Sequence, residues 1–247
     1  MGLIAAYKNF KASRLRKAIE KNSLLVKKPK AIREDRVQAI EFFSKIDDCQ
    51  IAIPALLTRF DFSLEHGIND TREKESTLQG IIRFGAEAIP LIKDHLKKSD
   101  RIAWPIKCLK EVASDQEVIE VLEAILDYND VALDQSKTEK NFDILCYLRD
   151  YSLAKDHPTR LTHFLQEHDE RVRYAAVEVL LKQDIEEVQE KLEPFIRDDS
   201  AENTRIRQVI IRAFIDKKLS LKDKAHFAVG PFIPGVAISH EFILTEI

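Results

Sequence analysis

Residues 168–200 read HDERVRYAAVEVLLKQDIEEVQEKLEPFIRDDS, and this stretch decides the fold. Its first half carries apolar residues at helical spacing: Val172, Ala175, Ala176, Val179 and Leu180. A second set follows a break at Gln183–Asp184: Ile185, Val188, Leu192, Phe195 and Ile196. Each set forms a stripe along one side of a helix. Because a lone helix cannot bury such a stripe, the stretch predicts an antiparallel helical hairpin that needs neighbouring hairpins.

Similar hairpins are predicted along most of the chain. Their expected ranges are 33–62, 70–98, 100–127, 130–167, 168–200 and a last one that opens at residue 203. Five acidic turn residues, spaced 30, 30, 39 and 30 apart, mark the repeats: Asp70, Asp100, Asp130, Asp169 and Asp199. Equal intervals with one insertion indicate an internal repeat. The predicted fold is therefore all-α, an α–α superhelix of about six hairpins over residues 31–229.

The composition agrees with a helical array. Hydrophobic residues make up 45% of the 247 residues, which is enough for a core, and 33% are charged, which is typical of long amphipathic helices. With only six glycines and eight prolines, the chain does not resemble a loop-rich or all-β protein.

Charge is distributed unevenly. Residues 1–33 hold seven lysines and three arginines against Glu20 alone, a charge of +9, so the remaining residues carry −12 of the overall −3. A basic head on an acidic body is not the profile of a general nucleic-acid binder. Residues 1–30 are predicted to form a helix that caps the first repeat, or a surface helix attracted to anionic lipid or an acidic partner.

Nothing in the sequence points to a metal, a cofactor or catalysis. Its three cysteines, Cys49, Cys108 and Cys146, lack CxxC spacing and are odd in number, which fits a reducing compartment. The seven histidines form no zinc-binding pattern, and phosphate-binding glycine motifs are missing. No apolar run approaches the roughly 18 residues that span a bilayer. We therefore expect a cytoplasmic protein that is not an enzyme.

Prolines and acidic residues predict where individual helices begin. Pro54 and Pro90 are expected in the first turn of a second helix, where a missing N–H costs least. Asp115 is expected to cap a helix, and Asp70 with Glu73 has the spacing of a capping box.

Two motifs resemble HEAT repeats, particularly the short bacterial HEAT-like type. Residues 169–176, DERVRYAA, look like the "D…VR..A" opening of a first helix, and residues 53–57 and 89–92 look like the "IP.L" second helix. This resemblance covers residues 33–225 and implies a solenoid whose second helices line a concave face. It also implies a structural ladder between turn aspartates and helix arginines: Asp70, Arg72, Asp169, Arg173, Asp199 and Arg207.

By the same resemblance, the concave face is where a HEAT-like scaffold binds its partner protein. The polar side of the second helices supplies the candidate binding residues: Lys93, Lys97, Glu120, Glu123, Glu186 and Glu190. We therefore expect a non-catalytic protein-interaction scaffold. The apolar tail, residues 230–247, is expected to cover the last repeat, to inhibit the groove or to recruit a partner.

Other functions stay open at this point. A HEAT-like alkylpurine DNA glycosylase would need several tryptophans and a catalytic aspartate, whereas Trp104 is the single tryptophan and the body is acidic. A HEAT-like bilin lyase has no residue in its favour. A peripheral membrane adaptor would use the basic residues 1–30.

Overall fold

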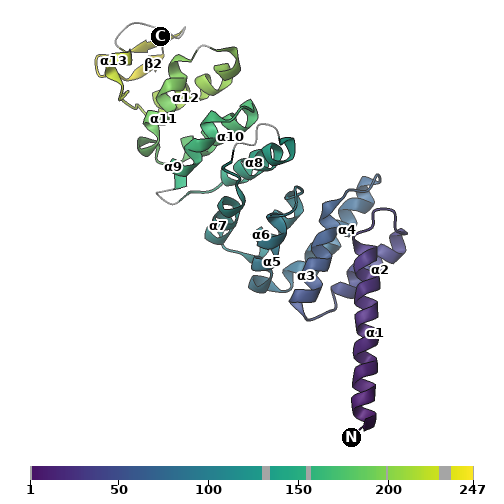
Figure 1. Cartoon of the computed structure of the whole chain (residues 1–247). Coiled ribbons are helices and arrows are strands. Elements are labelled where there is room, and N and C mark those ends of the chain that lie inside the picture. Colours follow the sequence, from purple (N-terminus) through teal and green to yellow (C-terminus); the bar gives the residue numbers. More distant parts are fainter. Residues whose placement is uncertain (1, 130–133, 154–156, 199, 228–234, 247) are drawn as a thin grey trace. The chain divides into compact units, whose positions relative to one another are not determined.

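The computed structural model describes residues 2–129, 134–153, 157–198, 200–227 and 235–246, with the side chains of residues 2–12, 157, 187, 225 and 226 left aside. The chain divides into two compact units, Met1–Ile125 and Leu126–Ile247. Almost all of the regular structure is helical, which confirms the predicted all-α class (Figure 1). The boundary between the units lies inside the array predicted for residues 31–229.

The first unit consists of helices joined by short turns. They are α1 (Gly2–Val26), α2 (Arg33–Phe43), α3 (Cys49–Leu57), α4 (Gly67–Ile82), α5 (Ala88–Leu96), α6 (Ala103–Val112) and α7 (Asp115–Ile125), with 3-10 turns η1 (Thr58–Asp61) and η2 (Gly85–Glu87). Helices α2, α4 and α6 contact one another in series, and α3, α5 and α7 form a second series. Their shared core includes Ile53, Ile81 and Ile92, all fully buried.

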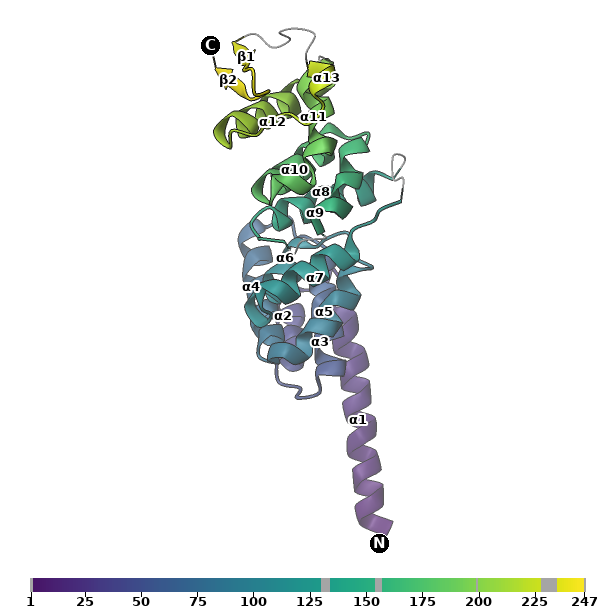
Figure 2. The same cartoon turned by 90° about the vertical axis from the view of Figure 1, so that its left-hand side faces the viewer.

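Helix α1 packs on α2 and is much longer than its neighbour. At about 1.5 Å per residue, its 25 residues span about 37 Å, while the 11 residues of α2 span about 16 Å. In both views the N-terminal half of α1 extends past the other helices of the first unit (Figures 1 and 2).

The second unit repeats the hairpin pattern. Its elements are α8 (Gln135–Leu148), α9 (His157–Leu161), η3 (Thr162–Gln166), α10 (Glu170–Lys182), η4 (Ile185–Glu187), α11 (Gln189–Arg197), η5 (Ala201–Asn203), α12 (Thr204–Asp216) and α13 (Lys224–Phe227). Helices α8, α10 and α12 contact in series, while η3 packs on α10 and α11 packs on α12.

The end of the chain forms a small β-hairpin that the sequence pattern did not predict. Strands β1 (Val236–Ile238) and β2 (Leu244–Glu246) pair antiparallel, with Ile238 opposite Leu244. Leu244 is 1% exposed, and β2 packs on α12. The described part of the tail thus contacts the last repeat, and the rest of residues 230–247 lies outside the described residues.

A cluster of buried charges holds the first two hairpins together. Glu73 of α4 accepts two hydrogen bonds from Arg36 of α2, at 2.6 and 2.8 Å, and one from Arg59 of η1 at 2.9 Å. Arg59, which is fully buried, also donates to Asp70 at 2.7 Å, and Lys74 pairs with Asp70 at 2.7 Å. Asp70 is therefore part of an ion cluster in the fourth position of α4 and is not a helix cap.

An arginine occupies the fourth position of three first helices. Arg36, Arg173 and Arg207 hold this position in α2, α10 and α12. Each donates to main-chain carbonyls that precede its helix: Pro29 and Ala31 for Arg36, Glu167 and His168 for Arg173, Ile196 for Arg207. Arg36 and Arg173 also reach the following hairpin, through Glu73 and Asn203.

The observed ladder therefore differs from the expected one. Asp169 binds Arg171 at 2.7 Å, because its cap position at the start of α10 faces that side chain, while Arg173 binds carbonyls. Arg72 is exposed, and Asp70 is bound by Arg59 and Lys74 instead. Asp199, like the turn residue Asp130, lies outside the described residues.

Two predicted helix starts are wrong. Pro54 is the sixth residue of α3, because Asp48 caps this helix earlier by accepting the Gln50 N–H at 2.9 Å. Ser114, not Asp115, caps α7: it exchanges hydrogen bonds with Glu117 in a capping box. Pro90 lies in the first turn of α5, as predicted.

Candidate functional site

Helix α11 borders two hollows in the second unit. Leu192, Phe195 and Ile196 bury its apolar side, while Glu190 is exposed. Both hollows include Glu190 and Pro194 in their linings. We call the first the loop hollow, because it adjoins the segment that follows α12, and the second the turn hollow, because it adjoins the turn before α10.

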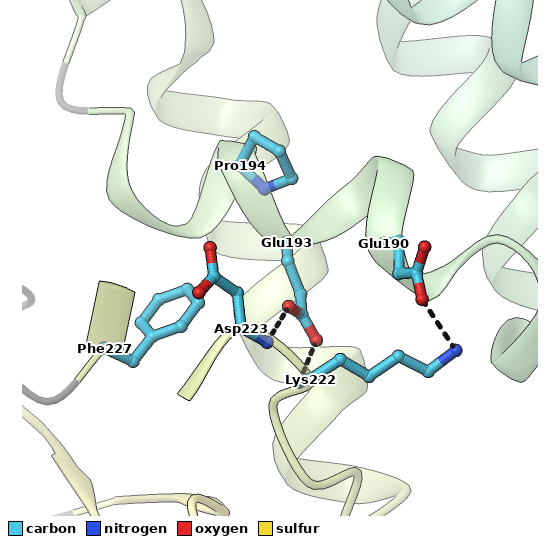
Figure 3. A pocket seen from close by; sticks show the side chains of 6 residues that line it. All are labelled: Glu190, Glu193, Pro194, Lys222, Asp223 and Phe227. Atoms are coloured by element: carbon cyan, nitrogen blue, oxygen red, sulfur yellow. Dashed lines mark hydrogen bonds and ion pairs between the residues drawn. The ribbon is translucent and has the colours of Figure 1, made fainter. Parts of the chain in front are cut away.

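The loop hollow has a volume of about 460 Å³ and is shown in Figure 3. Its Glu193 is 3% exposed and accepts hydrogen bonds from the N–H groups of Lys222 at 2.7 Å and Asp223 at 3.1 Å. This carboxylate therefore fastens the segment after α12 to α11. On the rim, Glu190 pairs with the Lys222 ammonium at 3.7 Å.

The turn hollow is larger, at about 620 Å³, and is acidic. Four carboxylates and two cationic side chains line it: Glu167, Glu190, Asp198, Glu202, Arg173 and Lys191. Hydrogen bonds from Ser200 and the Asn203 amide lower the pKa of Asp198, so this carboxylate is charged at neutral pH. The hollow thus offers a cation more favourable charge than it offers an anion.

Glu167 is the residue of the turn hollow whose side chain could accept hydrogen bonds from a ligand without losing a partner within the described chain. It is 8% exposed, and among the described residues its carboxylate has neither a hydrogen bond nor an ion pair. Its backbone is well bound, since its N–H donates to Phe164 and its carbonyl accepts from Arg173. Because hydrogen bonds to an ionised group are about twice as strong as those between neutral groups, a ligand that donates to the Glu167 carboxylate would be held by it.

Arg173 shapes the same hollow from the first turn of α10. It is 8% exposed; its Nη1 donates to the carbonyls of Glu167 and His168, at 2.7 and 2.9 Å. Its Nε donates to Asn203 at 3.2 Å, which leaves Nη2 without a hydrogen bond in the described part of the chain. Besides its other carboxylates, the hollow thus offers the Glu167 carboxylate as an acceptor and Arg173 Nη2 as a donor, and the acceptor suits a basic side chain.

The residues expected on a concave face fall into both units. Glu186 and Glu190 lie in the second unit, and the Glu186 carbonyl accepts from the Lys222 ammonium at 2.9 Å. In the first unit Lys97 and Glu120 are exposed, and Lys93 is half-buried. Glu123 is 7% exposed, so its expected place on a polar face is wrong, because α7 is buried on most of its sides.

A second polar cluster, in the first unit, joins an aspartate, a histidine and a serine. Asp61 Oδ1 lies 3.2 Å from His95 Nε2 and accepts the Ser99 hydroxyl at 2.9 Å. The aspartate is thus the central member, and the hydroxyl donates to it. A serine nucleophile would need the imidazole in that central place, so this cluster is not built for acyl transfer.

The described residues contain no group of three His, Cys, Asp or Glu side chains placed to bind a metal ion. Within the same residues, none of the helices combines the length and the apolar character that a membrane crossing requires. Comparisons with protein-family models, curated proteins and solved structures find no match to this chain.

Proposed function

We propose that this protein is a non-catalytic helical-repeat scaffold of the HEAT-like kind, and that it binds a basic segment of a protein partner in the turn hollow. The observation that carries the proposal is Glu167, a residue 8% exposed whose carboxylate has no hydrogen bond or ion pair among the described residues. A partner's lysine or arginine supplies the donors that this carboxylate lacks.

Charge supports a protein partner over a nucleic acid. Residues 126–247 hold 23 Asp and Glu against 17 Lys and Arg, a charge of −6. The hollow itself has twice as many carboxylates as cations. Phosphates would be repelled from such a surface, whereas a basic peptide would be attracted and oriented by it.

The test uses the full chain and a fluorescein-labelled octalysine peptide, with binding followed by fluorescence anisotropy. A hydrogen bond to a charged group contributes about 1.5–3 kcal/mol, so Glu167→Gln should weaken binding about ten- to hundred-fold. The matched control is Glu241→Gln, which removes one charge from an exposed position of the same unit. Equal dissociation constants for the two variants would contradict the proposal.

A stability measurement separates binding from a structural role. Because the Glu167 carboxylate has no hydrogen bond or ion pair to lose in the described chain, Glu167→Gln should leave the free energy of unfolding unchanged or raise it. A lower value, measured by urea unfolding, would mean that Glu167 supports the fold and not a ligand.

A further inference from the structure

Helix α1 carries its positive charge on several sides. At 100° per residue, Lys17 and Lys21 lie on one side of the helix together with Arg14, and Arg16 lies on another. All four side chains are exposed, and within the described part of the chain Arg16 pairs with Glu20, one turn away at 3.2 Å. A helix that lies on a membrane needs one apolar side opposite its basic side, and α1 has no such division. Its charge pattern therefore favours an acidic protein surface.

Much of α1 has room for such a partner. Its C-terminal part packs on α2 and ends in the fully buried Val26, whereas Leu15 is 50% exposed. The N-terminal half extends past the other helices of the first unit (Figure 2). Lys17 and Lys21 lie in the C-terminal half but are exposed, so they can contact a second molecule while α1 stays packed on α2.

We propose that the basic helix α1 of one copy docks at the turn hollow of a second copy. This inference rests on the proposed function and names the basic segment as the chain's own α1. Residues 1–33 carry +9 and residues 126–247 carry −6, so each copy presents both members of a complementary pair. Lys17 or Lys21 supplies the ammonium group to Glu167, while Glu190 and Glu202 line the hollow beside it.

The contact is head to tail, since α1 and the turn hollow are different surfaces. A heterologous contact that does not close into a ring adds copies one after another. Self-association should therefore grow with protein concentration. It should be present at about 0.1 M salt, where charges act over about 10 Å, and lost at about 1 M, where they act over about 3 Å.

The experiment measures the molar mass of the full chain by light scattering after size-exclusion chromatography. A head variant, Lys17→Glu with Lys21→Glu, and a hollow variant, Glu167→Gln with Glu190→Lys, should each elute at the mass of one chain, 28.5 kDa. Their equimolar mixture should elute at twice that mass, because the intact hollow of the first binds the intact α1 of the second. Lys45→Glu with Lys98→Glu, a matched reversal of two exposed lysines outside α1, should associate like the natural chain.

Any other set of masses contradicts the inference. A single-chain mass for the natural protein at every concentration excludes a second copy as the partner, and so does a mixture that stays monomeric. If octalysine still binds through Glu167 in those cases, the proposed function stands and only the partner is wrong. Sedimentation of the natural chain, but not the head variant, with phosphatidylserine vesicles, together with a monomeric mass, would assign α1 to lipid instead. Circular dichroism of both double variants checks that they are folded.

Discussion

Glu73→Gln tests the buried ion cluster of the first unit. The Glu73 side chain is 2% exposed and binds two guanidinium groups, those of Arg36 and Arg59. An amide offers a single oxygen and no charge, so at least one of the three observed hydrogen bonds is lost and both arginines lose a counter-charge. Removing one partner of a buried ion pair costs about 3–5 kcal/mol. Against a typical total of about 5–15 kcal/mol, this loss is large.

The single tryptophan provides an assay for this unit. Trp104 stacks on Phe60, with ring centroids 5.9 Å apart, and Phe60 is the neighbour of Arg59. Tryptophan fluorescence during urea unfolding therefore reports on the first unit, whereas far-ultraviolet circular dichroism reports on both. With a denaturant slope of about 2 kcal/mol per molar, the fluorescence midpoint should fall by about 2 M.

The control is Glu139→Gln, which removes the same group from an exposed ion pair in the second unit. Glu139 lies 3.0 Å from Arg171, and both side chains are about half exposed. Such pairs contribute at most about 1 kcal/mol, so the fluorescence midpoint should stay in place. A Glu73→Gln protein within about 1 kcal/mol of the natural one would refute the assignment of the cluster as a buried structural clamp.

Three further outcomes follow from the first unit. Gly80→Ala would place a methyl group against the Ser44 hydroxyl and 3.1 Å from Leu56 Cδ1, so overpacking should cost about 1–3 kcal/mol; Ser44→Ala added to it should restore part of the thermal midpoint. Burial raises the pKa of the Cys108 thiol to about 12, so maleimide at pH 8 should label Cys108 only in denaturant; rapid labelling of the native chain at this residue would contradict its burial. Burial alone would raise the pKa of Asp70, but hydrogen bonds from Lys74, Arg59 and the Leu64 N–H lower it below its usual value of 3.8. The charged Asp70 carboxylate therefore stabilises the fold fully above pH 3.8, and this contribution is lost as the pH falls through its lowered pKa. Asp70→Asn should then make the urea midpoint fall less steeply as the pH is lowered. An unchanged fall would assign the acid sensitivity to other groups.

The hairpins could be predicted because burial is periodic. In α10 every residue of the predicted stripe is buried: Val172, Ala175, Ala176, Val179 and Leu180. Helix ends were harder, since they depend on which polar side chain binds a free N–H. At α3 the side chain of Asp48 caps the helix, so Pro54 lies well inside it, although proline usually prefers the first turn.

The candidate site was only partly visible in the sequence. Glu190 was expected on an accessible second helix and does line both hollows. Glu167 was missed, because a single glutamate in a turn follows no period and its burial depends on the neighbouring hairpin. Arg59 was missed for the same reason. Its buried guanidinium has acceptors only because η1 packs on α4, which carries Glu73 and Asp70. A charged residue at an otherwise apolar helix position is the signal that could have drawn attention to it.

The arginines at the fourth position of α2, α10 and α12 have a consequence for engineering. Because Arg36 and Arg173 bind peptide oxygens of the segments that lead into their helices, these contacts do not depend on the side chains of those segments. The connecting residues can then be rewritten with little loss of cohesion, provided that the arginine is kept. Hairpins from this chain should accordingly be exchangeable where the following hairpin keeps an acceptor for the arginine, as Glu73 does for Arg36 and Asn203 does for Arg173.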